Sequence, residues 1–114
     1  MEDEVKDGGA AFPSKAAQDV LAERERQKSV EGWTPEHDDA HSEGDLAKAA
    51  ACYAAPRFHA NTELKVGPIG WPWSWEWWKP KDRRCDLVRA GALIAAEIDR
   101  LDRLTKREAE TQGS

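Results

Sequence analysis

The sequence predicts an all-α fold, because three segments show helical spacing of apolar or small residues and each follows a helix-capping residue. We expect a small antiparallel bundle of three main helices with a long tryptophan-rich loop over one end. The 114 residues are enough for one modest core. We therefore assign residues 1–13 to a flexible lead, 14–106 to a single helical domain and 107–114 to a flexible tail.

The first predicted helix begins after Ser14, whose hydroxyl can cap free backbone N–H groups, and covers residues 15–31. Polar side chains interrupt its apolar line, since Glu23 and Gln27 stand at helical spacing from the apolar residues. A carboxylate or amide in a core is costly unless it is paired. Two interpretations stay open: Glu23 belongs with residues 24–26 to a solvated face, or Glu23 and Gln27 line an internal polar site.

A second helix start stands at residues 34–36, where the sequence Thr-Pro-Glu suits a helix N-terminus. The stretch that follows is the most acidic of the chain, and Gly44 divides it from a longer, alanine-rich helix over 45–55. Extended backwards, the core line of that helix meets Asp39 and Glu43. This helix therefore also changes from apolar to acidic along one face.

The clearest helix begins after Asp82 and covers residues 83 to about 106. We expect Gly91 to mark a close crossing with the alanine-rich helix, because a glycine inside a helix costs about 1 kcal/mol relative to alanine. A unit so rich in alanine buries little apolar area, so we also expect a homo-oligomer. The line predicted to face the core consists of Leu87, Ala90, Gly91, Ile94, Ile98 and Leu101.

The loop over residues 56–81 holds five of the six tryptophans, all between Trp71 and Trp78, followed by a basic run over 79–84. Its segment 64–66 carries a weak signal for a two-stranded ribbon. Indole rings have large apolar faces, so they must pack on the chain, on a second copy or on a ligand. The tryptophans are thus either the lid of a small core or a platform that holds bases beside phosphate-binding cations.

Composition excludes several classes of function. The net charge of −5 argues against a general nucleic-acid binder and against attraction to an anionic membrane. There is no apolar run of the roughly 20 residues that a membrane helix needs, and the acidic N-terminus lacks a signal-peptide pattern. Cys52 and Cys85 lack metal-ligand spacing, so we expect free thiols.

The polar positions on the helices and the aromatic loop define a candidate site. If they meet, the site has carboxylates on one wall, guanidinium groups on another and indoles above, which suits a ligand with phosphates, hydroxyls and a flat ring. His37 and His41 stand one helical turn apart, a spacing that can hold a metal, but we interpret them as solvated and expect no metal. The candidate ligand-binding residues are Glu23, Arg26, Gln27, Trp33, His37, Asp39, Glu43, Trp71, Trp73, Trp77, Trp78, Lys79, Arg83 and Arg84.

Specific motifs over residues 20–104 resemble a family of small uncharacterised proteins from tailed phages and prophages. The resemblance implies a phage accessory protein in the bacterial cytoplasm and brings no known activity. The motifs lie at Glu23–Gln27, Glu31–Trp33, Glu36–Asp39, Ala49–Ala54, Trp71–Trp73, Trp77–Pro80 and Arg83–Ile94.

A weaker likeness is to the all-α MazG-like nucleotide pyrophosphohydrolases, which hold magnesium with Glu-x-x-Glu and Glu-x-x-Asp pairs on two helices. Residues 36–39, Glu-His-Asp-Asp, resemble one such pair. The second pair would be residues 83–86, where Arg83 replaces the glutamate. Because that departure removes a metal ligand, we expect a nucleotide to be bound rather than hydrolysed.

The leading hypothesis is therefore a non-catalytic binder that sequesters a nucleotide-derived small molecule, such as a cyclic nucleotide or ADP-ribose-type immune signal, and so counters bacterial defence. It requires no cofactor. The alternative is a pyrophosphohydrolase with magnesium or manganese held by Glu23, Glu36, Asp39 and Glu43. A further alternative is an inhibitor whose tryptophan loop docks on a host enzyme.

Overall fold

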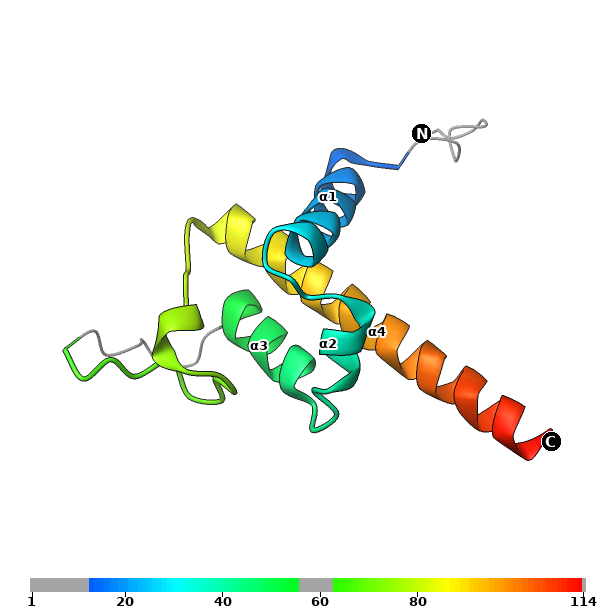
Figure 1. Ribbon diagram of the computed structural model, residues 1–114. Helices are drawn as coiled ribbons and strands as arrows, with labels where there is room; N and C mark the ends of the chain where they lie inside the picture. The colour runs from blue at the N-terminus through cyan, green and yellow to red at the C-terminus, as the bar shows by residue number, and fades with distance from the viewer. Residues whose placement is uncertain (1–12, 56–62, 114) are drawn as a thin grey trace.

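The computed structural model describes residues 13–55 and 63–113, and its long elements are all helices, which confirms the all-α prediction (Figure 1). Most of the predicted lead and the first part of the predicted loop, residues 56–62, lie outside the described residues. In the described part of the loop, Val66 forms an isolated bridge and no strand. The helices are α1 (Lys15–Ser29), α2 (Pro35–Asp39), α3 (Asp45–Ala54), the short 3-10 helix η2 (Trp75–Trp77) and α4 (Arg83–Gln112).

The predicted helix starts are confirmed by their capping bonds. The side chains of Ser14, Thr34 and Asp82 each accept a hydrogen bond from the backbone N–H three residues further on, at 3.2, 3.3 and 2.9 Å. Gly44 separates α2 from α3 with a φ of +81°, a left-handed conformation that glycine adopts at little cost. Among these helices none is long and apolar enough to cross a membrane.

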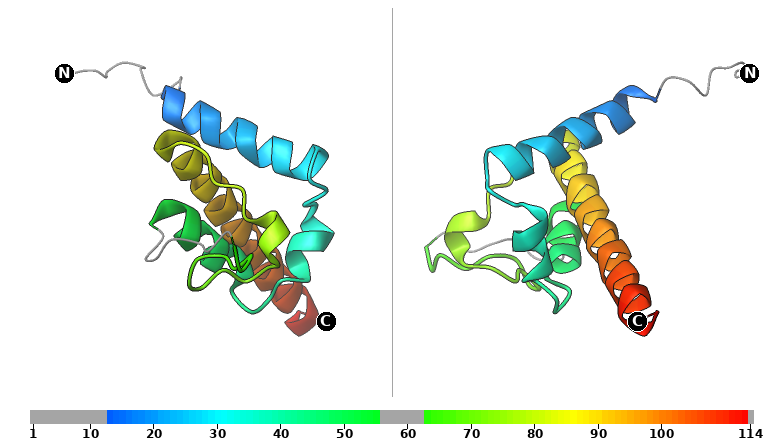
Figure 2. Two further views of the ribbon diagram at one scale, coloured as in Figure 1. Left: turned by 90° about the vertical axis from the view of Figure 1, so that its left-hand side faces the viewer. Right: turned by 45° about the vertical axis from the view of Figure 1, so that its right-hand side comes forward.

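The long helix α4 is the centre of the fold, because α1, α2 and α3 each pack against it. In the ribbon views α3 runs antiparallel beside α4, whereas α1 lies across the first half of α4 instead of alongside it (Figures 1 and 2). The core between α3 and α4 is made largely of small residues. Its buried members are Leu46, Ala49, Ala50, Tyr53, Ala90, Leu93 and Ala96.

The core-facing line predicted for α4 is partly wrong. Leu87, Ile94, Ile98 and Leu101 remain 45–52% exposed, while the face that carries Leu93 and its alanine neighbours is buried. The physical reason is that α3 also presents alanines, so the two helices approach most closely through their small side chains. Leu104 extends the exposed side, and we call these five residues the α4 stripe.

Two further predictions about α4 need correction. Gly91 lies against α1, not α3, since a Cβ atom built on it would be 3.1 Å from Cγ2 of Val20. The helix also continues past residue 106 to Gln112, through residues predicted to be a flexible tail. Its last turns are rich in Arg, Lys, Glu and Ala, which favour helix, and Arg107 donates a hydrogen bond to Asp39.

Two polar side chains of α1, those of Arg24 and Gln27, are buried. Gln27 is fully buried and its amide nitrogen donates to Glu23 at 3.2 Å. Arg24, one of the residues of the expected solvated face, is also buried and pairs with the buried carboxylate of Asp38 at 2.9 Å. Each interpretation is met in part: Gln27 and Arg24 are buried, whereas Glu25 is exposed and Glu23 pairs with Arg26.

Tyr53 at the end of α3 fastens the tryptophan loop to the core. Its hydroxyl donates to the carbonyl oxygen of Trp77 at 3.3 Å and accepts from the backbone N–H of Lys79 at 3.1 Å. Its ring stacks on Trp78 at 4.7 Å and meets Trp71 edge to face. These two tryptophans are thus part of the lid over the core, as one of the two interpretations predicts.

Candidate functional site

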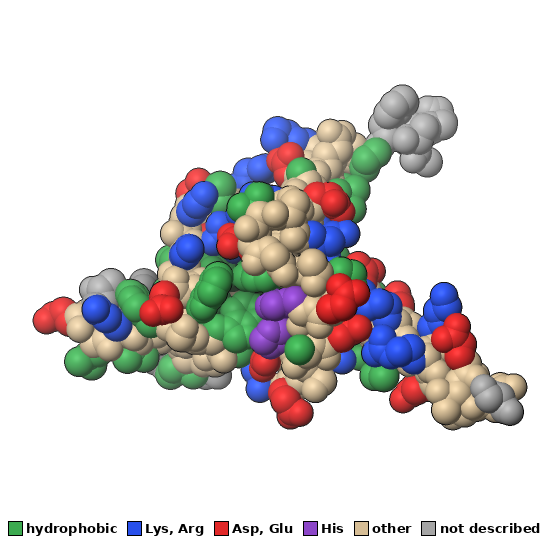
Figure 3. All heavy atoms as spheres, viewed as in Figure 1, with side chains coloured by type: hydrophobic (Ala, Val, Ile, Leu, Met, Phe, Trp, Pro, Cys, Tyr) green, Lys and Arg blue, Asp and Glu red, His purple; other side chains and the backbone are tan. Residues whose placement is uncertain are grey.

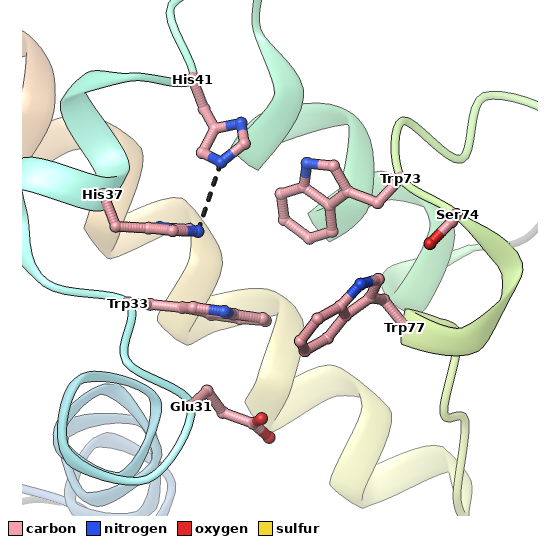
Figure 4. Close-up of a pocket in the computed structure, with 7 residues that line it drawn as sticks. All are labelled: Glu31, Trp33, His37, His41, Trp73, Ser74 and Trp77. Atoms are coloured by element: carbon pink, nitrogen blue, oxygen red, sulfur yellow. Dashed lines mark hydrogen bonds between the residues drawn. The ribbon is translucent and has the colours of Figure 1, made fainter.

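An aromatic cavity of about 350 Å³ lies where the α1–α2 connection, α2 and the tryptophan loop meet (Figure 4). Figure 3 shows the histidine side chains on this face beside a hydrophobic area, with charged side chains on either side. We call this space the aromatic cavity. It is lined by Glu31, Trp33, His37, His41, Trp73, Ser74 and Trp77.

A backbone hydrogen bond positions Trp33, which forms one wall of the aromatic cavity. Its backbone N–H donates to the carbonyl of Gln27 at 2.9 Å, which holds it directly after α1. The Trp33 ring lies nearly parallel to that of His37, with 7° between their planes and 5.9 Å between centroids. Trp73 packs against Trp33 at 5.6 Å with a 52° tilt. Trp77 comes from η2 across the opening, where it is 44% exposed.

A small bridging cavity of about 20 Å³ shares Glu31, Trp33 and Trp77 with the aromatic cavity. Its other walls are Tyr53 and three cationic side chains. Those cations are Arg26, Lys79 and Arg89.

A third space of about 360 Å³, the cationic cavity, lies between α1 and the start of α4. It shares Arg26 and Arg89 with the bridging cavity, so the three spaces are adjacent and run from aromatic walls to basic ones. Its lining residues are Asp19, Ala22, Glu23, Arg26, Lys81, Arg84, Cys85, Val88 and Arg89.

Most of the charges near these spaces are paired. Arg26 bonds Glu23 at 2.8 Å and Glu31 at 3.1 Å, and Arg84 pairs with Asp19. Burial alone would raise the pKa of Glu23, but the hydrogen bonds and charge of Arg26, with Gln27 and Arg89, lower it overall. The hydrogen bond to Glu23 raises the pKa of Arg26, so this guanidinium stays charged.

Lys79 differs from the arginines of the bridging cavity. Arg89 lies 5.0 Å from the centroid of Tyr53 and donates to the carbonyl oxygen of Lys79. The ammonium group of Lys79 lies 5.7 Å from the Trp77 ring centroid, and within the described residues it has no ion pair. A ligand can therefore reach this cation without breaking a salt bridge.

The structure brings eight of the fourteen sequence-predicted site residues to these cavities. They are Trp33, His37, Trp73 and Trp77 in the aromatic cavity, Arg26 and Lys79 in the bridging cavity, and Glu23 and Arg84 in the cationic cavity. The other six line none of the three: Gln27 is buried, Trp71 and Trp78 cover the core, Glu43 and Arg83 are exposed, and Asp39 pairs with α4.

Sequence reasoning missed several lining residues. His41 carried a signal, its i+4 spacing from His37, whereas Arg89 carried none, because the sequence does not show which face of α4 is buried. Glu31 carried a signal only as part of the motif at residues 31–33, and Ser74 carried none, since it belongs to a loop whose path the sequence does not fix.

Asp39, one of the carboxylates of the alternative metal hypothesis, is already paired with α4. Asp39 accepts hydrogen bonds from Arg103 at 2.8 Å and Arg107 at 3.2 Å, and the Arg103 bond is the main cause of its lowered pKa. No group of three or more His, Cys, Asp or Glu side chains arranged to hold a metal occurs in residues 13–55 and 63–113. Cys52 and Cys85 are both free thiols.

Comparison with known proteins gives the chain no family: no family model matches it, and no match was found to a curated protein or to a solved structure.

Proposed function

We propose that this protein binds and sequesters a nucleotide-derived small molecule without catalysis. The observation that carries the proposal is the adjacency of an aromatic cavity to a cluster of cations: Trp33 and Trp77 are walls of the aromatic cavity and also of the bridging cavity that holds Lys79. Aromatic faces hold bases by stacking, and nearby cations hold phosphates.

The dimensions and charges fit such a ligand. About 350 Å³ lies within the roughly 300–1,000 Å³ range of small-molecule pockets. A base stacked on Trp77 places its phosphate toward Lys79, whose ammonium lies over the same indole ring. The paired carboxylates Glu23 and Glu31 are hydrogen-bond acceptors for ribose hydroxyls or base amines, while Arg26 offsets their charge.

The alternative functions have less support among the described contacts. A metal-dependent pyrophosphohydrolase needs free, convergent carboxylates, whereas Glu23 and Asp39 each bond guanidinium groups. An inhibitor that docks its tryptophan loop on a host enzyme needs exposed indoles, and Trp71, Trp73 and Trp78 pack against the core cluster instead. In a phage, sequestration of an immune signal such as a cyclic nucleotide or ADP-ribose derivative would counter host defence.

Calorimetric titration with AMP, ADP-ribose and a cyclic dinucleotide tests the proposal. We expect at least one of them to bind with a Kd in the micromolar range or tighter, about −8 kcal/mol, and to be recovered intact after denaturation of the protein. Binding of all three weaker than millimolar would contradict it. Release of pyrophosphate from a nucleoside triphosphate would favour the enzyme instead.

We also propose that the protein is a homodimer whose two α4 stripes pack antiparallel. Arg83 and Glu108 are exposed on the same side of α4 as the stripe, at its opposite ends, and neither has a partner in the part of the chain that is described. An antiparallel pair places Arg83 of each copy beside Glu108 of the other, and the same register sets Leu87 opposite Leu104. A parallel pair would instead oppose like charges.

Sedimentation equilibrium should give about twice the chain mass of 12.8 kDa. The double substitution Ile94→Glu/Ile98→Glu should give the monomer, because it sets carboxylates in the apolar seam. Val30→Glu changes a 70% exposed apolar residue outside the stripe and should leave the dimer intact. A wild-type monomer at millimolar concentration would refute the dimer, as would a dimer that survives the double substitution.

A further inference from the structure

We propose that His37 and His41 form a binding site for a divalent transition-metal ion of the zinc type, open to the aromatic cavity. The Nε2 atoms of the two rings face each other at 3.3 Å, and both rings line the cavity (Figure 4). This inference does not rest on the proposed nucleotide ligand, because it concerns the histidine pair alone.

The tautomers of the two rings follow from their other nitrogens. Nδ1 of His37 lies 3.2 Å from the carboxylate of Asp38, and Nδ1 of His41 lies 3.2 Å from that of Asp45. A carboxylate oxygen can accept a hydrogen bond from each Nδ1–H. In that tautomer both Nε2 atoms of the neutral rings present lone pairs, which repel each other unless a proton or a metal cation lies between them.

The geometry fits a metal ion in that place. Two zinc–nitrogen bonds of about 2.0–2.1 Å at a tetrahedral angle set the nitrogens about 3.3 Å apart. Histidines that bind metals commonly donate their other N–H to a carboxylate, which fixes the ring and makes it a better ligand. Here both rings have such a carboxylate, and the Asp38 side chain is fully buried and held by Arg24.

The site would be incomplete without an external ligand. Two imidazoles fill two of four positions, and the remaining two are left for water or for an anionic group of a molecule in the aromatic cavity. Imidazole ligands favour Zn²⁺, Ni²⁺ and Cu²⁺ over Mg²⁺, which prefers oxygen. The two histidine side chains are partly buried, with 31% and 25% of their surface exposed, so solvent or a ligand can reach both.

Calorimetric titration of the full chain with ZnCl₂ tests the inference. We expect one Zn²⁺ per chain in the micromolar range, no binding of Mg²⁺, and a loss of roughly tenfold or more in affinity for His37→Gln and for His41→Gln. Asp45→Asn should weaken binding roughly 10–100-fold without removing a direct ligand. His59→Gln, which changes the third histidine of the sequence, is the matched control and should bind as the wild type does.

Circular dichroism of each variant confirms that its helices are intact. Co²⁺ in place of Zn²⁺ should give the visible absorption of a tetrahedral site, and the band should disappear in His41→Gln. Zn²⁺ affinity no tighter than millimolar, or equal in wild type and in His37→Gln/His41→Gln, would overturn the site. An NMR signal from a hydrogen held between the two Nε2 atoms would also overturn the site if it persisted in excess Zn²⁺.

Discussion

Trp77→Ala should abolish most of the nucleotide affinity while leaving the fold unchanged. Its ring is 44% exposed and is a wall of both the aromatic and the bridging cavity. Stacking of a base on an aromatic side chain contributes about 1–3 kcal/mol, so its loss should raise Kd roughly 5–150-fold. Calorimetric titration of the variant with the panel ligand that the wild type binds most tightly measures the change.

Variants at two neighbouring tryptophans test whether the loss of affinity is specific to Trp77 or follows from removing any indole of the loop. Trp75 lines none of the three cavities and does not pack against the core cluster, so Trp75→Ala should retain wild-type affinity. Trp78 stacks on Tyr53, so Trp78→Ala should lower the free energy of unfolding more than it changes ligand binding. Equal Kd values for wild type and Trp77→Ala would show that the ligand does not contact this indole.

The helix boundaries could be predicted because they depend on chemistry within a few residues. Ser14, Thr34 and Asp82 each cap a helix through a hydrogen bond to a backbone N–H three positions away, and Gly44 breaks the chain where its φ must be positive. The C-terminal end of α4 lacks such a signal. Its helix continues through polar residues with good helix propensity, past the end that apolar periodicity predicts.

The buried face of α4 could not be predicted because α4 has two apolar faces. One carries Leu87, Ile94 and the rest of the α4 stripe, and the other carries Leu93 with small residues. Periodicity favoured the first because its side chains are larger. Within a single copy the smaller face is buried, since alanines on α3 and α4 let the two backbones approach closely. An antiparallel dimer would bury the predicted face as well.

The candidate site was predictable in its residue types and only partly in its membership. Trp77 was selected as part of the tryptophan-rich loop, and it lines two cavities. Asp39 was selected because it extends the core line of the helix over 45–55 backwards, yet it pairs with Arg103, 64 residues later in the chain. Asp39 meets Arg103 because α2 packs on α4, and no pattern within a few residues of Asp39 predicts that contact. The sequence therefore indicates which residues are unusual, but not which of them meet.

Asp38→Ala should lower the free energy of unfolding by about 3–5 kcal/mol, because it leaves the charge of Arg24 buried and unpaired. The Asp38 side chain is fully buried, and its bond to Arg24 at 2.9 Å joins α1 to α2. Nε and Nη1 of Arg24 have no other partner among the described residues. Small domains have only about 5–15 kcal/mol of total stability, so urea unfolding should show a much lower midpoint.

The charge explanation is tested by removing both partners. Arg24→Leu/Asp38→Leu should recover most of the lost free energy of unfolding, since apolar residues of similar volume avoid the desolvation of two charges. Glu25→Ala breaks the exposed pair with Lys28 on the same helix and should change the free energy of unfolding little.

The Arg24–Asp38 ion pair also holds His37, because Asp38 contacts the His37 ring, so Asp38→Ala should also weaken ligand binding at the aromatic cavity. If Asp38→Ala were as stable as Glu25→Ala, the buried pair would not be what joins α1 to α2, and the cavity wall would need another support.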